Sequence, residues 1–281
     1  MNAIEVRGLH KRYGEHEAVR GIDISVRRGE VFGLLGPNGA GKTTTVEILE
    51  GYRRRTGGEV SVLGYDPARR QIELRRRIGI VLQSGGVYSH VTPREALRHW
   101  ASFYPAPRDV EEVLELTGLG AQADVRSRRL SGGQLRRLDL ALALVGDPEL
   151  MFLDEPTTGF DPEARRGAWE TVRSLRDLGK TVLLTTHYLD EAQELADRVA
   201  IVKDGRVLAI GPPRELGVGV AQYRVAWRSA DGELEERQTD DPTLLLHELT
   251  SAALERGEQL RELSVGRPTL EDVYLELTAD G

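Results

Sequence analysis

Short apolar runs, many of them separated by Gly and Pro, alternate along this chain with longer amphipathic stretches. Runs rich in Val, Ile and Leu predict β-strands, whereas apolar positions that recur every three or four residues predict helices. Strands are expected at Ile4–Leu9, Ile22–Val26, Val31–Leu35, Val60–Leu63, Ile78–Leu82, Leu150–Leu153, Val182–Thr185, Arg198–Val202 and Arg206–Ala209. Helices are expected at 41–51, 93–103, 132–145, 162–178 and 188–195. Asp-Gly within Lys203-Asp204-Gly205-Arg206 predicts a tight hairpin turn, because these residues accept positive φ.

Strands that flank long helices predict an α/β domain with a largely parallel sheet. Residues 93–146 carry helical patterns without a convincing strand, so we interpret them as a helical insertion into that domain. Gly211-Pro212-Pro213 closes the main domain, and after Leu216 the pattern changes to YRVAWR, LLLHELTSAALER and PTLEDVYLEL. The chain therefore divides into a main domain at 1–216 and a small α+β C-terminal appendage at 217–281.

Composition and charge narrow the class of protein. With 281 residues, 40% of them hydrophobic and 30% charged, the chain has the balance of a globular protein of one large domain and a small one. It has no cysteine, which excludes disulfides and thiolate metal sites and suits the cytosol. The net charge of the whole chain is −7, and that of residues 231–281 alone is about −10. Such an acidic tail opposes binding to a nucleic acid.

The apolar runs also bear on location. The opening residues MNAIEVRGLHKRYG lack the apolar core of a signal peptide. Stretches such as VFGLL and ALALV are much shorter than the roughly 18 apolar residues that a membrane span needs. We therefore expect a cytoplasmic chain, whose role at a membrane would require a partner chain.

A glycine-rich segment follows the apolar run VFGLL and precedes the helix-forming TVEILE. In this context the pattern G-x-x-x-x-G-K-T predicts a loop whose backbone N–H groups surround the phosphates of ATP. Lys42 would reach the β- and γ-phosphates, and the Thr43 hydroxyl would bind Mg²⁺. Lys42 is one of only four lysines beside 34 arginines, and a compact ammonium suits such a loop better than a guanidinium. The predicted ATP-binding residues here are Gly36, Pro37, Asn38, Gly39, Ala40, Gly41, Lys42, Thr43 and Thr44.

Two acids follow the apolar strand Leu150–Leu153. A parallel sheet binds ligands at the carboxyl ends of its strands, so Asp154 is placed to bind Mg²⁺. Glu155 can orient and deprotonate an attacking water, which is worth about 10²–10⁴ in rate. The alternative is a pair of helix N-cap residues, which the preceding strand and Pro156 disfavour.

A second anion-binding helix terminus is predicted at Leu130–Gln134. Ser131 can cap the helix that follows, and two glycines leave further N–H groups exposed. Because one ATP already occupies the first loop, this terminus is best explained as closing on the nucleotide of another subunit. The simpler alternative is an ordinary loop before a helix. The predicted binding residues are Ser131, Gly132, Gly133 and Gln134.

Together these segments, in this order over residues 4–216, resemble the ATPases of ATP-binding cassette (ABC) transporters, a P-loop NTPase fold. The resemblance implies that Tyr13 stacks on adenine, that Gln83 contacts Mg²⁺ and the membrane partner, and that His187 contacts the γ-phosphate. Taken singly, these residues could instead be a packing tyrosine, a polar strand end and a helix cap. The implied metal ligands are Thr43, Gln83 and Asp154, and the implied catalytic residues are Lys42, Glu155 and His187.

Three further features qualify the resemblance. Asp161, in Gly159-Phe160-Asp161, matches the family's D-loop at the dimer contact, or it only caps the helix that starts at Pro162. Leu135 stands where the family usually has a polar residue, and Phe160 stands where leucine is common. Neither departure touches a catalytic atom, so both concern the dimer interface.

EPTTGFDP and the tail RPTLEDVYLELT (267–278) resemble the daunorubicin-resistance-like exporters. That resemblance implies two copies that enclose two Mg-ATP, Lys42 of one facing Ser131 of the other, on the inner face of the cell membrane. It also implies a separate six-helix permease that exports drugs, lipids or other amphiphiles. The alternatives are an importer ATPase, which the tail disfavours, and a soluble ABC ATPase of translation or DNA repair. The double cassette and long coiled coil typical of those soluble proteins are missing here. The cargo, and whether the dimer is homomeric, stay open.

Overall fold

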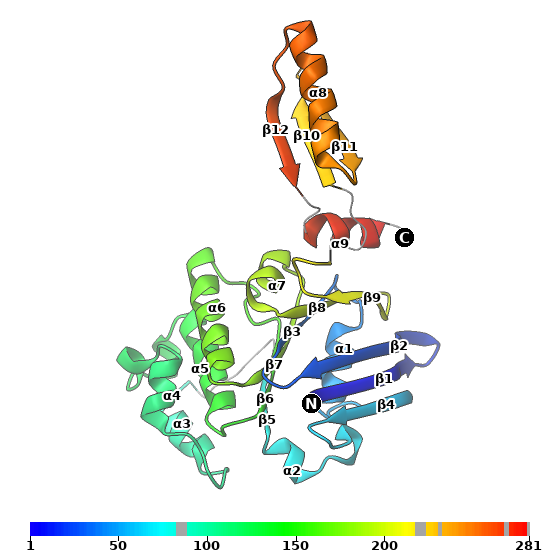
Figure 1. The fold of residues 1–281 in the computed structure, drawn as a ribbon. Coiled ribbons are helices and arrows are strands. Elements are labelled where there is room, and N and C mark those ends of the chain that lie inside the picture. Colours follow the sequence, from blue (N-terminus) through cyan, green and yellow to red (C-terminus); the bar gives the residue numbers. More distant parts are fainter. Residues whose placement is uncertain (83–88, 217–222, 230–231, 267–269, 280–281) are drawn as a thin grey trace. The chain divides into compact units, whose positions relative to one another are not determined.

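The computed structural model describes residues 1–82, 89–216, 223–229, 232–266 and 270–279 (Figure 1). The chain forms two compact units, Met1–Ile210 and Gly211–Gly281. The division lies just before Gly211-Pro212-Pro213, whereas the sequence predicted it after Leu216. No helix in the described ranges is long and apolar enough to cross a bilayer.

A six-stranded sheet forms the centre of the first unit, in the order β5-β6-β7-β3-β8-β9. The neighbouring strands from β5 to β8 pair in parallel. The predicted α/β class with a largely parallel sheet is therefore confirmed. β3, β6 and β7 are buried along their whole length, as expected for central strands of a parallel sheet. The strands are β3 (Val31–Leu35), β5 (Ile78–Val81), β6 (Leu150–Asp154), β7 (Thr181–Thr186), β8 (Arg198–Lys203) and β9 (Arg206–Gly211).

A second, antiparallel sheet has the order β2-β1-β4, with β1 at Asn2–Tyr13, β2 at His16–Arg27 and β4 at Gly57–Val62. The sequence predicted the apolar centres of these strands but neither their full length nor a separate sheet. Along β1 and β2, buried and exposed residues largely alternate, because only one face of this sheet packs on the core.

The parallel sheet is packed on both faces. On one face, helix α1 (Lys42–Leu49) and the antiparallel sheet enclose a core that includes Phe32, Phe152 and Leu183. Residues of the other face, such as Met151 and Leu184, pack in a second core with α5, α6 and α7. Burying one such side chain contributes about 1.5–3 kcal/mol, so the two cores fix the strand ends. These helices are α5 (Gly132–Leu144), α6 (Pro162–Asp177) and α7 (Leu189–Leu195).

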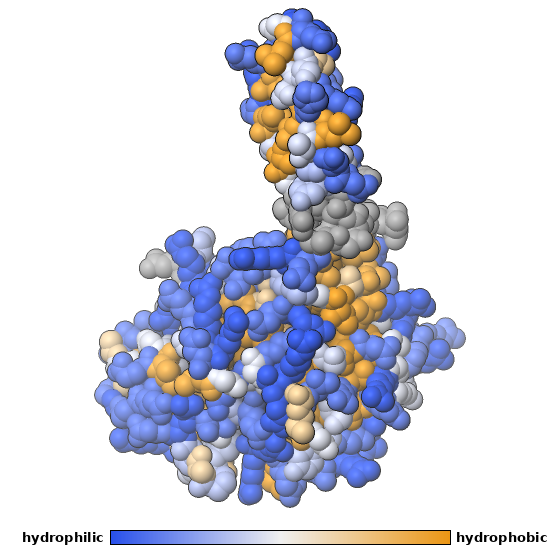
Figure 2. Space-filling model, viewed as in Figure 1, coloured by the Kyte–Doolittle hydropathy of each residue, from blue (hydrophilic) through white to orange (hydrophobic). Residues whose placement is uncertain are grey.

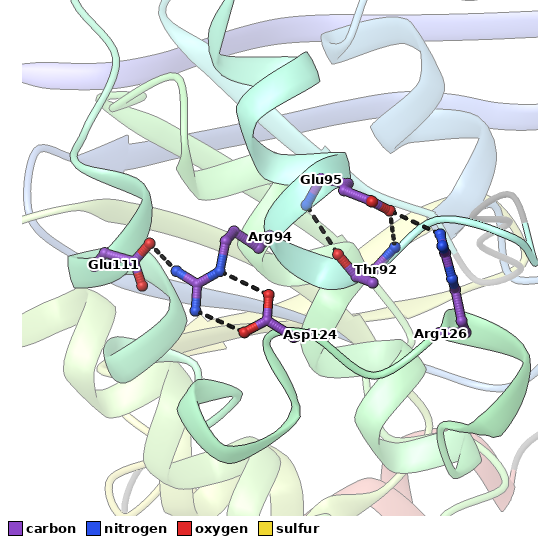
Figure 3. Close-up of polar contacts among 6 residues, drawn as sticks. All are labelled: Thr92, Arg94, Glu95, Glu111, Asp124 and Arg126. Atoms are coloured by element: carbon purple, nitrogen blue, oxygen red, sulfur yellow. Dashed lines mark hydrogen bonds and ion pairs between the residues drawn. The ribbon is translucent and has the colours of Figure 1, made fainter.

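The residues between β5 and β6 form the helical insertion, with α3 at Pro93–Ala101 and α4 at Val110–Leu116. Thr92 and Glu95 form a capping box at the start of α3, and the Glu95 carboxylate also pairs with Arg126 (Figure 3). Arg94 bridges α3 to Glu111 of α4 and to Asp124. These polar contacts fix the insertion around its apolar side chains. Shorter helical turns lie at α2 (Ile72–Arg75), Pro67–Arg69, Gly120–Gln122 and Ser127–Arg129.

The second unit is a three-stranded antiparallel sheet, in the order β11-β10-β12, with helix α8 packed against β10. Val225 and Trp227 of β10 form its small core with Leu245 of α8. Figure 2 shows hydrophobic side chains on the surface of this unit. Leu244 and Leu254 of α8 are among its exposed large hydrophobic residues. Its elements are β10 (Tyr223–Arg228), β11 (Leu234–Thr239), α8 (Pro242–Arg256), β12 (Arg261–Gly266) and α9 (Leu270–Ala279).

Gly79 sets the distance between β5 and α5. A methyl group there would lie 2.6 Å from the carbonyl oxygen of Ala143 and 3.0 Å from Cγ of Pro148. We expect Gly79→Ala to lower the free energy of unfolding of the first unit by about 1–3 kcal/mol, measured by urea denaturation. Gly57→Ala in β4 of the same unit is the control, because its methyl group would make only ordinary contacts, the nearest at 3.5 Å from Cβ of His10. Equal stability of both variants would contradict this packing.

Candidate functional site

The glycine-rich loop between β3 and α1 is held in place by close backbone contacts. A methyl group on Gly36 would lie 2.1 Å from the carbonyl oxygen of Val202, and one on Gly41 would lie 2.5 Å from that of Ala18. Gly41 also has a φ of 97°, which a residue with a side chain adopts only with strain. The N–H of Gly205 donates to the carbonyl of Ala40 at 3.0 Å. The neighbouring strands therefore impose the shape of the loop.

A cleft of about 270 Å³ opens over this loop. It brings Tyr13 and Glu155 to the predicted phosphate loop, although 142 positions separate them in the sequence. Two residues of the β1–β2 hairpin that the sequence analysis did not identify, His16 and Ala18, also line it. Their residue types carry no signal, and only the fold brings them here. The lining residues are Tyr13, His16, Ala18, Asn38, Gly39, Gly41, Lys42, Thr43, Thr44 and Glu155.

Lys42 places a cation beneath the cleft, and only 4% of the residue is exposed. Its Nζ donates to the carbonyl oxygens of Gly36 at 2.7 Å and of Pro37 at 3.0 Å. Burial lowers the pKa of Lys42, and the nearby carboxylates of Glu155 and Asp154 oppose that effect. A buried cation next to a helix N-terminus favours an anionic ligand.

Asp154 lies at the carboxyl end of β6 and is 8% exposed. Its Oδ1 accepts a hydrogen bond from the Thr185 hydroxyl at 2.5 Å, and burial is the main cause that raises the pKa of this carboxyl. The Thr185 hydroxyl also accepts from the N–H of Glu155 at 3.0 Å. Thr185 thus bonds the carboxylate of Asp154 and the backbone of Glu155. It lies opposite Asp154 in the β6–β7 register. Local sequence pattern does not identify Thr185, whose only signal is its place at the end of a central strand.

Glu155 has a φ of 45°, in the left-handed region that residues other than glycine rarely adopt. Its Oε2 accepts from the Thr158 hydroxyl at 3.0 Å. Nδ1 of His187 lies 3.3 Å from Oε1 of Glu155, and the His187 ring contacts that of Tyr188. Local strain of this kind clusters at functional sites. Here it accompanies a carboxylate that faces the cleft and contacts the predicted histidine.

The second predicted anion site does not line this cleft. Ser131 caps α5, with its hydroxyl accepting from the N–H of Gln134 at 3.2 Å, while the Gln134 side chain accepts from the N–H of Ser131 at 2.9 Å. Ser131 and Gly132 are exposed. Asp161 caps α6 through the N–H of Ala164 at 2.8 Å. Ser131, Gly132, Gly133 and Gln134 are therefore separate from the cleft of their own chain.

The donor set suits a magnesium ion held partly by phosphate. Among the described residues there is no group of three or more His, Cys, Asp or Glu that could hold a metal. Mg²⁺ commonly takes one or two carboxylates together with phosphate oxygens and water. Asp154 and Thr43 fit that pattern beside the phosphate loop, whereas Gln83, the third predicted ligand, lies outside the described residues.

Tyr13 stands at the rim of the cleft and is 39% exposed. Nζ of Lys11 lies 4.8 Å from the centre of its ring, and the guanidinium of Arg53 lies 5.4 Å from it. An exposed ring with cations on it offers a surface for a planar, electron-rich base. The stacking role of Tyr13 on adenine stays a prediction.

Comparison with known proteins agrees with this geometry. The family model described as ABC transporter matches residues 19–158. The daunorubicin resistance ATP-binding protein DrrA3 of Streptomyces coeruleorubidus is 39% identical, covering 99% of this chain and 96% of its own. The Nod factor export ATP-binding protein I of Paraburkholderia xenovorans is 40% identical, covering 98% and 97%. A solved structure described as the ATP binding subunit of an ABC transporter has a TM-score of 0.70 at 25% identity, covering 98% and 99%.

The chain thus has the fold of the solved ATP binding subunit. Over nearly its whole length it is also similar in sequence to the two relatives named above. The chain belongs to the ABC transporter family, as one of its ATP-hydrolysing, nucleotide-binding subunits.

Proposed function

We propose that this chain hydrolyses Mg-ATP in the cleft over the glycine-rich loop and thereby powers export of an amphiphilic compound through a separate permease. The cleft that joins the phosphate loop to Glu155 is the observation that carries the hydrolysis step. The export step is supported by the full-length similarity to a daunorubicin resistance protein and to a Nod factor export protein. This similarity includes the second unit, which a generic cassette does not need.

Each residue of the site has its own role in the proposed hydrolysis. Lys42 and the loop N–H groups bind the phosphates, and Thr43 and Asp154 would hold the Mg²⁺ that neutralises phosphate charge when bound. Glu155 accepts a proton from the attacking water. His187, which contacts Glu155, would donate a hydrogen bond to the γ-phosphate. Tyr13 would stack on the adenine.

The site needs a second chain to be complete. Ser131 and the N–H groups of Gly132 and Gly133 lie at the exposed start of α5, outside the cleft of their own chain. In a head-to-tail pair of two copies, this terminus would close on the nucleotide bound at Lys42 of the other copy. Charge-assisted hydrogen bonds of about 1.5–3 kcal/mol each would hold the pair closed until the γ-phosphate is released.

A second cavity supports the permease as a partner. It has a volume of about 490 Å³ and lies between the end of α1, strand β5 and helices α3 and α5. Beside it, the rings of His99 and Trp100 on α3 and of Phe103 just after this helix form an exposed aromatic cluster. Exposed aromatic side chains next to a cavity are typical of protein interfaces. With this partner, the chain would lie on the inner face of the membrane.

Co-purification tests the partner directly. The chain, expressed in its native host with an affinity tag, should retain a six-span membrane protein after detergent extraction. Inside-out vesicles with that complex should accumulate an amphiphilic dye only with ATP. Capture of no membrane protein would favour a soluble ABC ATPase, and release of the dye from the vesicles would favour an importer.

Removing the charge of Glu155 should trap the closed pair. We expect Glu155→Gln to lower phosphate release by about 10²–10⁴-fold, because the water loses its base, while ATP binding remains. Light scattering should then show a dimer in Mg-ATP. Glu194→Gln, at an exposed residue that pairs with Arg173, is the matched control and should hydrolyse ATP normally. A monomer with unchanged turnover in Glu155→Gln would refute the proposal.

Thr185→Val should disturb the positions of Asp154 and Glu155 without changing their charge. The variant keeps the shape of the side chain but removes the hydroxyl shared by Asp154 and the N–H of Glu155, at a cost of about 1–3 kcal/mol in unfolding free energy. We expect kcat to fall about tenfold or more, with a smaller change in KM. Thr117→Val removes a buried hydroxyl that bonds only within the α4 region, so it should lose stability and keep kcat. Equal kcat in both variants would exclude a positioning role for Thr185.

A further inference from the structure

Glu50 ends helix α1 at a position that is unfavourable for an acid. Only 8% of the residue is exposed, and it lies in the wall of the 490 Å³ cavity. A helix C-terminus carries partial negative charge, so a carboxylate there is repelled. Within the described residues its carboxyl group has no hydrogen bond or ion pair. The carboxyl group thus lines the cavity without a charge partner among the described residues, and it is available to a cation that enters from outside.

The charges around Glu50 favour a cation as that ligand. Asp154 of β6 and Glu47 of α1 both add to the effect of burial, which raises the pKa of Glu50 to about 8. Asp139 of α5 is a second acid in the same wall, with Arg136 4.0 Å away, and burial raises its pKa too. Glu47 is already paired with Arg53.

The remaining charged group of the lining does not satisfy Glu50. Arg75 of α2 lines the cavity, yet it forms no ion pair with Glu50 in the part of the chain that the structure describes. Tyr104, whose pKa burial raises, stays neutral at ordinary pH. The lining therefore has two acids against one base, and the acid with no partner is the more deeply buried of the two.

The rest of the lining suits the stem of a long basic side chain. Tyr52, Trp100, Tyr104 and Leu142 provide aromatic and apolar surface next to the two acids. Arg and Lys pack their methylene groups along such surface, and their charged ends interact favourably with aromatic faces. The cavity has a volume of about 490 Å³, which is enough for one or two long side chains.

We propose that Glu50 recognises a Lys or Arg side chain that the permease inserts into this cavity, and that Glu50 releases its proton to solvent as the two chains dock. The neutral carboxyl loses one proton and becomes the carboxylate of a buried ion pair, so charge balances. This inference rests on the proposed partnership with a permease and names the chemistry of its docking segment.

The test measures docking to the permease that co-purifies with the chain, immobilised in detergent, at pH 6.5 and pH 8.5. Wild-type affinity should rise about tenfold or more with pH, because the proton that must leave at pH 6.5 has already left at pH 8.5. Glu50→Gln should bind about tenfold more weakly at pH 8.5 and lose the pH dependence. The glutamine side chain has the shape of the protonated glutamic acid, so the variant should fold. Thermal unfolding of the variant checks this. Glu73→Gln, at an exposed acid of α2 outside the lining, should behave as wild type.

The outcomes separate the two proposals. If wild type and Glu50→Gln bind the permease equally and with the same pH dependence, the role of Glu50 is refuted and the partnership stands. If the wild type binds no membrane protein at either pH, both are refuted. Calorimetry of the isolated chain with MnCl₂ or CaCl₂ covers a metal site: heat of binding that disappears in Glu50→Gln would overturn the inference in favour of a metal ion.

Discussion

The close backbone packing of the glycine-rich loop is the constraint on which the site depends. At Gly36 and Gly41, carbonyl oxygens of β8 and β2 approach so closely that no side chain fits. The same contacts tie the loop to strands far away in the sequence, so the loop keeps its shape without a ligand. Preorganised N–H groups bind an anion without first paying the entropy of ordering the loop. The two cores on either side of the parallel sheet hold this arrangement in place.

The charged side chains around that loop are Lys42, Asp154 and Glu155, and neutral groups contact each of them. Lys42 donates to two carbonyl oxygens of its own loop, while the Thr185 hydroxyl bonds the carboxylate of Asp154 and the backbone N–H of Glu155. Neutral groups thus take part in fixing the cation and the acids of the site. Such a site leaves the charges available for phosphate, metal and water, which a buried Lys–Asp pair would not.

The sequence predicted the parallel sheet, its helices and the glycine-rich loop because each has a strong local pattern. Val31–Leu35 and Leu150–Leu153 are continuous apolar runs, and the helix after Gly41 follows a motif with a clear mechanism. β11 and β12 were missed because their residues are polar and exposed along nearly the whole strand. Thr185 was missed for another reason, since its role comes from register across the sheet, which local pattern does not encode. The roles of Gln83 and of the Ser131 helix terminus remain predictions.

Helix α1 reaches both the nucleotide cleft and the second cavity. Its N-terminus follows the phosphate loop, and its C-terminus ends at Glu50. At about 1.5 Å per residue, eight residues separate these ends by only about 12 Å. The macrodipole of the helix favours an anion at the first end and a cation at the second. A ligand that shifts this short, buried helix at one end must therefore alter the fit at the other. Asp154, at the end of β6, adds to the effect of burial that raises the pKa of Glu50, so an acid of the nucleotide site also acts on the second cavity.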